Sequence, residues 1–306
     1  MDDIEVRELR YFFAVAQELN FTRAAERLGI AQPPLSAAIA KLERKLGVPL
    51  LERTSRQVTL TPAGEVLLEQ GRIAVEGFGA AIERARRKGG HGDRLTVAVK
   101  AGGGTDLLRK VAQRCAQDPQ MPEVHVLFGH YGEQVAALRD GTADVALLRT
   151  PFDARGLDTE VLLVEPRVVA LPAEHRLAGR RELCRADLAE EPLPRWEPHD
   201  SVVAAHWADW TKDSAGSART AEGPRVTDIN QLLDAVALGQ TIAYLPLSAA
   251  HQYSRGDLVF RPVADLSPST LAAAWPDTCR SRAVAGFIQA AVDVAREFAD
   301  QAAVLA

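Results

Sequence analysis

The first sixty positions carry apolar residues at helical spacing, which predicts three short helices separated by tight turns. The first helix has its apolar positions at Leu9, Phe12, Phe13, Ala16 and Leu19. Thr22 is the expected cap of a second helix that ends at Gly29, and Pro33 and Pro34 lie where a third helix begins. This third helix is expected to end at Gly47. Its buried positions should be Leu35, Ile39, Leu42 and Leu46.

Two short runs, 48–51 and 57–60, predict a hairpin with Arg53 and Arg56 in its turn. Thr61-Pro62 then opens a long helix that runs to about Lys88 and carries an apolar stripe. The stripe consists of Val66, Leu67, Ile73, Val75, Phe78 and Ile82. A lone helix would leave these side chains in water, so we expect two chains to pair there. The glycine-rich run 89–92 predicts a linker and the domain boundary.

From residue 95 onward, short strands alternate with helices. The expected order is a strand at 95–99, a helix at 106–117, a strand at 124–128, a helix at 134–139 and a strand at 145–148. This βαβαβ order predicts a parallel sheet with right-handed crossovers. Further strands are expected at 168–171, 241–245, 259–262 and 271–275, and helices at 202–210, 229–238 and 283–298.

The composition is that of a globular protein, because 47% of the 306 residues are hydrophobic and 25% are charged. No apolar run is long enough to span a membrane, and no secretory pattern opens the chain. The three cysteines are far apart. We therefore expect a cytoplasmic protein without a disulfide framework or structural zinc. A net charge of −5 means that only a small local part of the chain could bind nucleic acid.

Ala25, Gly29 and Leu35 have the spacing of a helix-turn-helix. Ala25 lets two helices approach, Gly29 accepts the positive φ of the turn, and Leu35 packs the second helix on the first. Such a unit places its second helix in the major groove of double-stranded DNA. The predicted base contacts are Gln32, Pro33 and Ser36, and the predicted phosphate contacts are Arg53 and Arg56. The alternative is a small helical bundle that does not bind DNA.

The stretch from Leu9 to Leu67 resembles the DNA-binding head of LysR-type transcriptional regulators. Most of the resemblance lies in "FTRAAERLGIAQPPLS" and "LERKLGVPLLERTSRQVTLTPAG", and "QPPLS" is most similar to members that control aromatic-compound degradation. "LRDGTADVALLR", "ALGQTIAYLP" and "LAAAW" extend the resemblance over nearly the whole chain. Ala37 and Ala38 depart from it, because these positions are often polar in the family. More of the DNA contact therefore falls to the residues before them.

The resemblance implies an α/β fold with an N-terminal winged helix-turn-helix domain at 1–60 and a dimerisation helix and hinge at 61–90. A two-lobed effector-binding domain like a periplasmic binding protein would occupy 91–306. Its first lobe is expected at about 91–163 plus 268–306 and its second at about 164–267. The resemblance also implies a homotetramer, built as a dimer of dimers, that bends promoter DNA. RNA polymerase would be a further partner, and no cofactor is expected.

The effector would bind between the lobes, at the carboxyl ends of strands. Lys100 and the loop Gly102-Gly103-Gly104-Thr105 precede a helix, whose free N–H groups suit an anion. The alternative is a flexible turn with a solvated lysine. Other strand ends supply His130, Tyr131, Arg149, Thr150, Arg195, Trp196 and Thr227, each of which alone is alternatively a surface residue. Together these cations and aromatic rings predict a carboxylate-bearing effector.

Three classes of function are compared. The favoured one is a transcriptional regulator that responds to a small molecule. The alternative is a solute-binding protein without DNA function, which the N-terminal helix-turn-helix and the missing leader weigh against. An α/β enzyme would need a reactive constellation, and the His and Cys residues show neither nucleophile nor metal spacing. We therefore expect no catalytic residues and no metal ligands.

Overall fold

The computed structural model describes residues 4–53, 58–90, 94–100, 104–130, 132–196 and 222–305. The chain divides into two compact units. The first is Met1–Arg86 with Arg139–Gly141, and the second is Arg87–Leu138 with Thr142–Ala306. Within the described ranges, no helix is both long and apolar enough to cross a membrane. The helix predicted at 202–210 lies outside the described residues.

The first unit begins with helices α1 (Val6–Glu18), α2 (Phe21–Leu28) and α3 (Gln32–Leu46), packed around a buried apolar cluster. Gly29 and Gly47 end α2 and α3 in the left-handed conformation, as the sequence predicts. The expected cap of α2 is wrong, because Asn20 caps this helix instead of Thr22. The backbone of Asn20 is extended, and its side-chain oxygen accepts the N–H groups of Thr22 and Arg23.

The hairpin pairs β1 (Leu51–Arg53) antiparallel with β2 (Val58–Leu60). Its first strand begins at Leu51 and not at Val48, because the chain that leads into the strand is hydrogen-bonded to α3. Glu43 Oε1 accepts the N–H groups of Leu50 and Leu51, at 2.9 and 3.2 Å. The hairpin is therefore anchored to the C-terminal half of α3.

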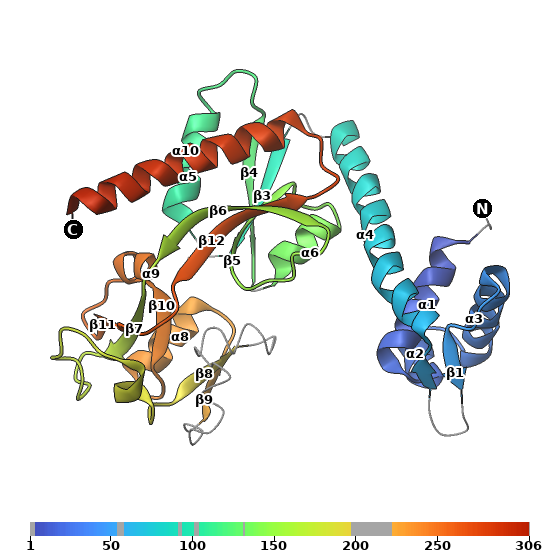
Figure 1. Cartoon of the computed structure of the whole chain (residues 1–306), viewed down its shortest axis with the longest axis horizontal. Coiled ribbons are helices and arrows are strands. Elements are labelled where there is room, and N and C mark those ends of the chain that lie inside the picture. The colour runs from blue at the N-terminus through green and yellow to red at the C-terminus, as the bar shows by residue number, and fades with distance from the viewer. Residues whose placement is uncertain are drawn as a thin grey trace. The chain divides into compact units, whose positions relative to one another are not determined.

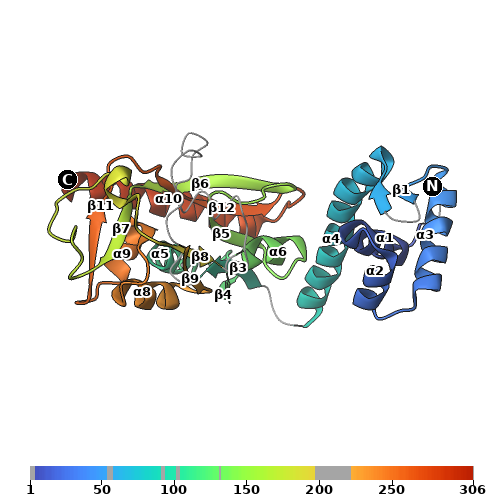
Figure 2. The same cartoon turned by 90° about the horizontal axis from the view of Figure 1, so that it is seen from below.

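Helix α4 (Pro62–Gly90) is preceded by Thr61, whose hydroxyl accepts the Gly64 N–H at 3.0 Å. Gly64 lies so close to the Leu50 carbonyl that a Cβ would not fit. Gly71 packs against the Phe13 ring, which places α1 between α4 and α3 (Figure 2). The helix continues through Gly90, so the linker predicted from residue 89 begins too early. A glycine at a helix end costs only about 1 kcal/mol, which the preceding good helix formers offset.

The second unit contains a five-stranded sheet in the order β4-β3-β5-β12-β6. Its strands are β3 (Arg94–Lys100), β4 (Glu123–Gly129), β5 (Val145–Arg149), β6 (Leu157–Glu165) and β12 (Ser269–Pro276). β3 runs parallel to β4 and β5, which confirms the predicted βαβαβ order. β12 runs antiparallel to β5 and β6, so the complete sheet is mixed. The reason is that the chain returns to this sheet at the carboxyl end of β5, where Leu271 lies opposite Arg149, and then runs back along β5.

Helices cover both faces of this sheet. α5 (Thr105–Cys115) and α10 (Arg282–Leu305) pack together on one face over a core that contains Leu107 and Phe287 (Figure 1). α6 (Glu133–Arg139) covers the other face with Val135 and Leu138. Sheet and helices together are called the first lobe.

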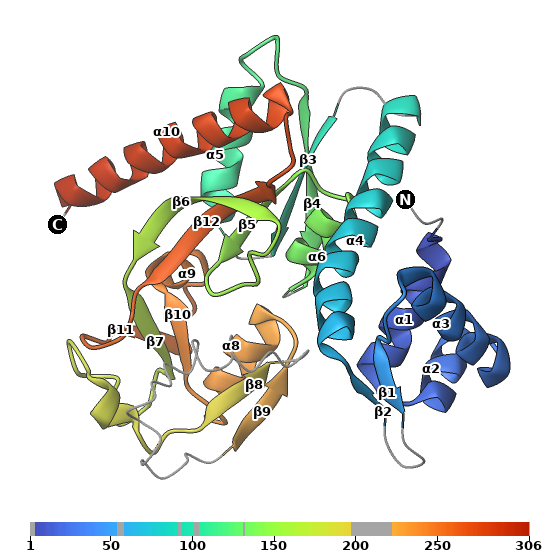
Figure 3. The same cartoon turned by 45° about the vertical axis from the view of Figure 1, so that its right-hand side comes forward.

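The second lobe is inserted between β6 and β12. Its three-stranded sheet has β7 (Arg167–Pro172) between β10 (Ala243–Pro246) and β11 (Leu258–Pro262), both antiparallel to it. A parallel pair, β8 (Leu193–Trp196) and β9 (Glu222–Val226), lies beside α8 (Ile229–Ala237) (Figure 3). The remaining helices are α9 (Leu247–Gln252) and the 3₁₀ turn η1 (Arg185–Leu188). The sequence analysis predicted β7, β10, β11 and α8 and missed β6, β9 and α9.

Candidate functional site

The predicted DNA-contacting residues lie on and after the start of α3. Gln32 and Pro33 are exposed in its first turn, and Ser36 is partly buried one turn later. Arg53 is the last residue of β1, and its side chain is outside the described part of the structure. Arg56 also lies outside the described residues. The exposed start of α3 is thus open to a ligand.

A buried carboxylate fixes α3 to α1. Glu8 of α1 is 4% exposed and receives Lys45 Nζ at 2.8 Å and Lys41 Nζ at 3.1 Å, both from α3. It also accepts the Glu5 N–H at 3.0 Å. Burial disfavours the charged form, but the hydrogen bonds from Lys45, Glu5 and Lys41 outweigh it and hold the pKa of Glu8 at about 2. Glu8 is therefore ionised at neutral pH and sets the position of α3.

Helix α4 exposes large apolar side chains in the single chain. Val66, Phe78, Ile73 and Ile82 are 63%, 53%, 39% and 38% exposed. Their spacing places them along the helix where the sequence predicts a contact between two chains. A second copy of α4 is the kind of surface that would cover such a stripe.

Two of the predicted effector residues meet across the lobes. Lys100 ends β3 of the first lobe, and its Nζ lies 4.3 Å from the ring centroid of Trp196, which ends β8 of the second lobe. Burial lowers the pKa of Lys100 to about 8, although attraction by Asp228 opposes this, and repulsion by Arg149 adds to it. The ends of β3 and β8, one from each lobe, therefore meet here.

Arg149 is the second cation of this region, and its side chain is only 9% exposed. Its Nη1 donates to Ser269 Oγ at 2.8 Å, and its Nη2 donates to Glu165 Oε1 at 2.7 Å and Ser248 Oγ at 3.2 Å. Its Nε is buried and has no hydrogen-bond partner among the described residues. Such a donor is costly unless a ligand or water satisfies it. We call Lys100, Arg149, Glu165, Trp196, Asp228 and Ser248 the interlobe cluster.

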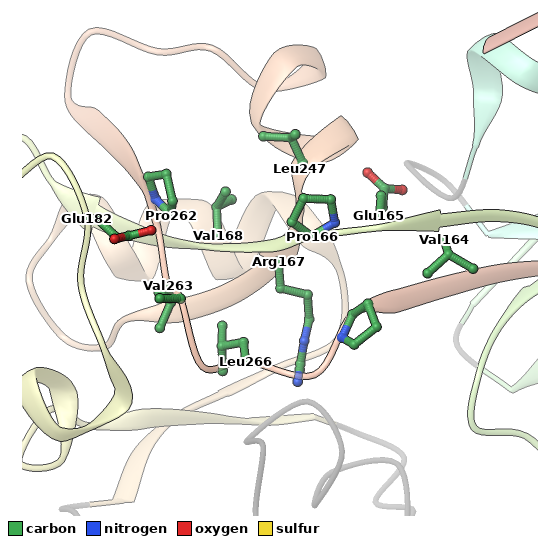
Figure 4. Close-up of a pocket in the computed structure, with 12 residues that line it drawn as sticks. Val164, Glu165, Pro166, Arg167, Val168, Glu182, Leu247, Pro262, Val263 and Leu266 are labelled. Atoms are coloured by element: carbon green, nitrogen blue, oxygen red, sulfur yellow. The ribbon is translucent and has the colours of Figure 1, made fainter. Parts of the chain in front are cut away.

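Glu165 lies where the chain crosses from β6 to β7. Its two oxygens accept the Ser248 N–H at 2.6 Å and the Ser248 hydroxyl at 3.0 Å, which ties the crossover to the start of α9. The Arg167 side chain points to the opposite side from Glu165 (Figure 4). It donates to the carbonyl and the hydroxyl of Ser267, each at 2.6 Å. A cavity of about 450 Å³ lies beside the crossover, lined mainly by apolar residues such as Pro166 and Val263. The interlobe cluster is thus connected to this crossover through Glu165, and through Ser269 to the point where the chain returns from the second lobe into β12.

The other predicted effector residues that the structure describes lie beside strand ends and helix starts of the two lobes. Gly104 has a φ of 100° and precedes α5, and Thr105 is exposed at its first position. The His130 N–H donates to Glu133 within its own loop at 2.7 Å, and Thr227 bonds Gln231. Thr150 is partly buried beside Arg149, and Arg195 is exposed. Gly102, Gly103 and Tyr131 lie outside the described residues.

Sequence reasoning missed Glu165, Ser248, Ser269 and Asp228. Asp228 could have been found, because an aspartate directly before an apolar helical pattern is a usual N-cap. Glu165 follows an apolar run and precedes a proline. This pattern indicates the end of a strand, but it does not indicate which residues Glu165 contacts. Ser248 and Ser269 had no local signal. No group of His, Cys, Asp and Glu residues able to hold a metal ion occurs in the ranges that the structure describes.

Comparison with family models and known proteins gives a consistent result. Residues 6–65 match the model "Bacterial regulatory helix-turn-helix protein, lysR family", and residues 88–296 match the "LysR substrate binding domain". The Hca operon transcriptional activator HcaR of Escherichia coli K12 is 36% identical over 279 residues, covering 89% of this chain and 92% of that protein. CatR of Pseudomonas putida is 32% identical over 278 residues, covering 86% and 89%.

Solved structures agree in fold. Full-length CbnR in complex with its target DNA is 26% identical and covers 95% of this chain and 100% of that one, with a TM-score of 0.53. Full-length BenM is 24% identical and covers 97% and 98%, with a TM-score of 0.57, a likeness that concerns the fold alone.

Proposed function

Because the chain belongs to the LysR family of bacterial transcriptional regulators, it is a DNA-binding regulator with an effector-binding domain, and we propose that a carboxylate bound at the interlobe cluster is its effector. Its relatives are transcriptional regulators, so a solute-binding protein without DNA function is excluded.

The observation that carries the carboxylate proposal is the Nε of Arg149, buried and without a partner among the described residues. Lys100 adds a second cation that burial has partly stripped of water. Glu165 neutralises Arg149 from one side only, through Nη2. A carboxylate accepting from Nε would satisfy the buried donor with a charge-assisted hydrogen bond. The other sequence-predicted residues at the strand ends would line the same region.

On the DNA side, Gln32, Pro33 and Ser36 would read bases, and Arg53 and Arg56 would hold phosphates. CbnR was solved with its target DNA, which supports a DNA role for the matching head. The exposed stripe on α4 would pair two chains, and pairs would assemble into a homotetramer. This corresponds to a division at about 1–60, 61–90 and 91–306. The chain would act in the cytoplasm, without catalysis and with RNA polymerase as a further partner.

Calorimetric titration of the full chain with small carboxylic acids and their uncharged amides tests the effector proposal. Carboxylates should bind and the matching amides should not, because an amide cannot neutralise Arg149 and Lys100. Arg149→Met should weaken binding more than about tenfold, since removing one partner of a buried charge pair typically costs 2–5 kcal/mol. Arg109→Met, on the exposed face of α5, is the matched control. Equal affinity for acids and amides would overturn the proposal.

A further inference from the structure

Asp228 is the acidic residue of the interlobe cluster on the second-lobe side. It follows β9, in which Val226 pairs with Trp196 of β8. The Lys100 ammonium lies over the Trp196 ring. Its charge reaches Lys100 and also Tyr253, whose pKa is raised by burial and by Asp228. Trp196 and Tyr253 both pack against the apolar cluster of α8. Asp228 therefore lies beside the same groups that surround the proposed carboxylate.

Only half of the Asp228 carboxylate is used by the fold. Its Oδ1 caps α8 and accepts the N–H groups of Asn230 at 2.8 Å and Gln231 at 3.0 Å. Within the described part of the chain, Oδ2 accepts no hydrogen bond. Asp228 is partly buried, so this oxygen is not fully surrounded by water. One acceptor with a negative charge is thus left beside the effector region.

We propose that Asp228 determines effector specificity: the site selects a monocarboxylate that also carries a hydroxyl or an amine, and it disfavours dicarboxylates. The proposal rests on the carboxylate site described above. Arg149 and Lys100 hold the carboxylate on the first-lobe side. A hydroxyl or amine on the same molecule donates to Asp228 Oδ2, whereas a second carboxylate meets a like charge.

The conservative variant Asp228→Asn separates this role from helix capping. Asparagine caps helices as well as aspartate, so α8 keeps its N-terminal hydrogen bonds. The variant loses the negative charge, and an amide NH2 replaces Oδ2, so this position donates a hydrogen bond instead of accepting one. Asp234→Asn makes the same change farther along α8, where Asp234 pairs with Arg255 on the surface, and serves as the matched control.

Two matched series of probes are titrated into the full chain and into both variants. Benzoate, 3-hydroxybenzoate and isophthalate share a ring and differ in one substituent, namely hydrogen, hydroxyl or carboxylate. Butyrate, 3-hydroxybutyrate and methylsuccinate repeat the comparison without a ring. The wild type should prefer the hydroxyl compound over the dicarboxylate in the series that it binds. Asp228→Asn should reduce that preference by about tenfold, the usual effect of one hydrogen bond to a charged group.

The outcomes distinguish the two proposals. A wild-type preference that Asp228→Asn removes and Asp234→Asn retains supports the role of Asp228. Binding of carboxylates with the same ranking in wild type and Asp228→Asn overturns that role and leaves the carboxylate site standing. A wild-type preference for dicarboxylates also overturns it. If the wild type binds none of the six probes at millimolar concentration, the carboxylate proposal itself fails, and this inference fails with it.

Discussion

Replacing Glu8 by glutamine should loosen the attachment of α3 to α1 and destabilise the first unit. Glutamine keeps the size of the side chain and removes the charge that Lys41 and Lys45 contact. The pKa of Glu8 is held at about 2, against 4.5 for the free group. A shift of this size corresponds to about 3 kcal/mol. Since Lys41 is 51% exposed and screened by water, we expect a loss of about 1–2 kcal/mol at neutral pH.

The same pKa predicts how the stabilisation depends on pH. The folded-state pKa lies below the unfolded value, so the contribution is complete above about pH 4.5 and is lost as the pH falls through about 2. Urea unfolding of the full chain, followed by far-ultraviolet circular dichroism, would measure the loss in the transition of the first unit. The control is Glu26→Gln, an exposed site on α2. Equal unfolding midpoints for wild type and Glu8→Gln at neutral pH would refute the reasoning.

Three further predictions concern DNA, assembly and pH. Gln32→Ala should cost about 1–3 kcal/mol in DNA affinity and relax the preference at one base pair per half-site; a gel-shift series with substituted operators would detect it. Phe78→Asp should shift the chain towards monomer in sedimentation and abolish tight DNA binding, and a wild type that is already monomeric at micromolar concentration would contradict this. Carboxylate affinity should fall as the pH rises through about 8, where Lys100 loses its charge, and Lys100→Met should flatten this profile.

The local features of the first unit could be predicted from sequence because short-range physics determines them. Gly29, Gly47 and the Pro33-Pro34 start of α3 each follow from the conformation that the residue allows. The cap of α2 was misassigned because Asn20 and Thr22 are both good caps and only the backbone conformation decides between them. The extent of α4 past Gly89 likewise depends on small differences in free energy at a helix end.

In the second unit, Lys100 and Arg149 end β3 and β5, which are parallel neighbours in one sheet, so the sequence could place them at the same edge. Trp196 ends β8 of another sheet, and its contact with Lys100 follows from the arrangement of the two lobes, which the strand pattern does not determine. The partners of Arg149 could not be predicted, since Glu165 and Ser248 are 83 residues apart in sequence and meet only through the crossovers. β6 was missed because most of its residues are exposed at the edge of the sheet, Val161 and Val164 included, so no alternating pattern forms. The antiparallel direction of β12 depends on the end of the sheet at which the chain comes back from the second lobe, and no local pattern indicates this.

The position of β12 has a consequence for synthesis of the protein. This strand lies between β5 and β6, yet it comes after the entire second lobe in the chain. Until Ser269–Pro276 leaves the ribosome, β5 and β6 each lack the neighbour that completes their ladder, and α10 is not there to cover Leu107. A nascent chain that ends before residue 269 therefore leaves β6 unpaired and one edge of β5 open, and such edges are templates for aggregation. Premature termination just before Ser269 should accordingly yield insoluble product, even though both the DNA-binding head and the second lobe have been made in full.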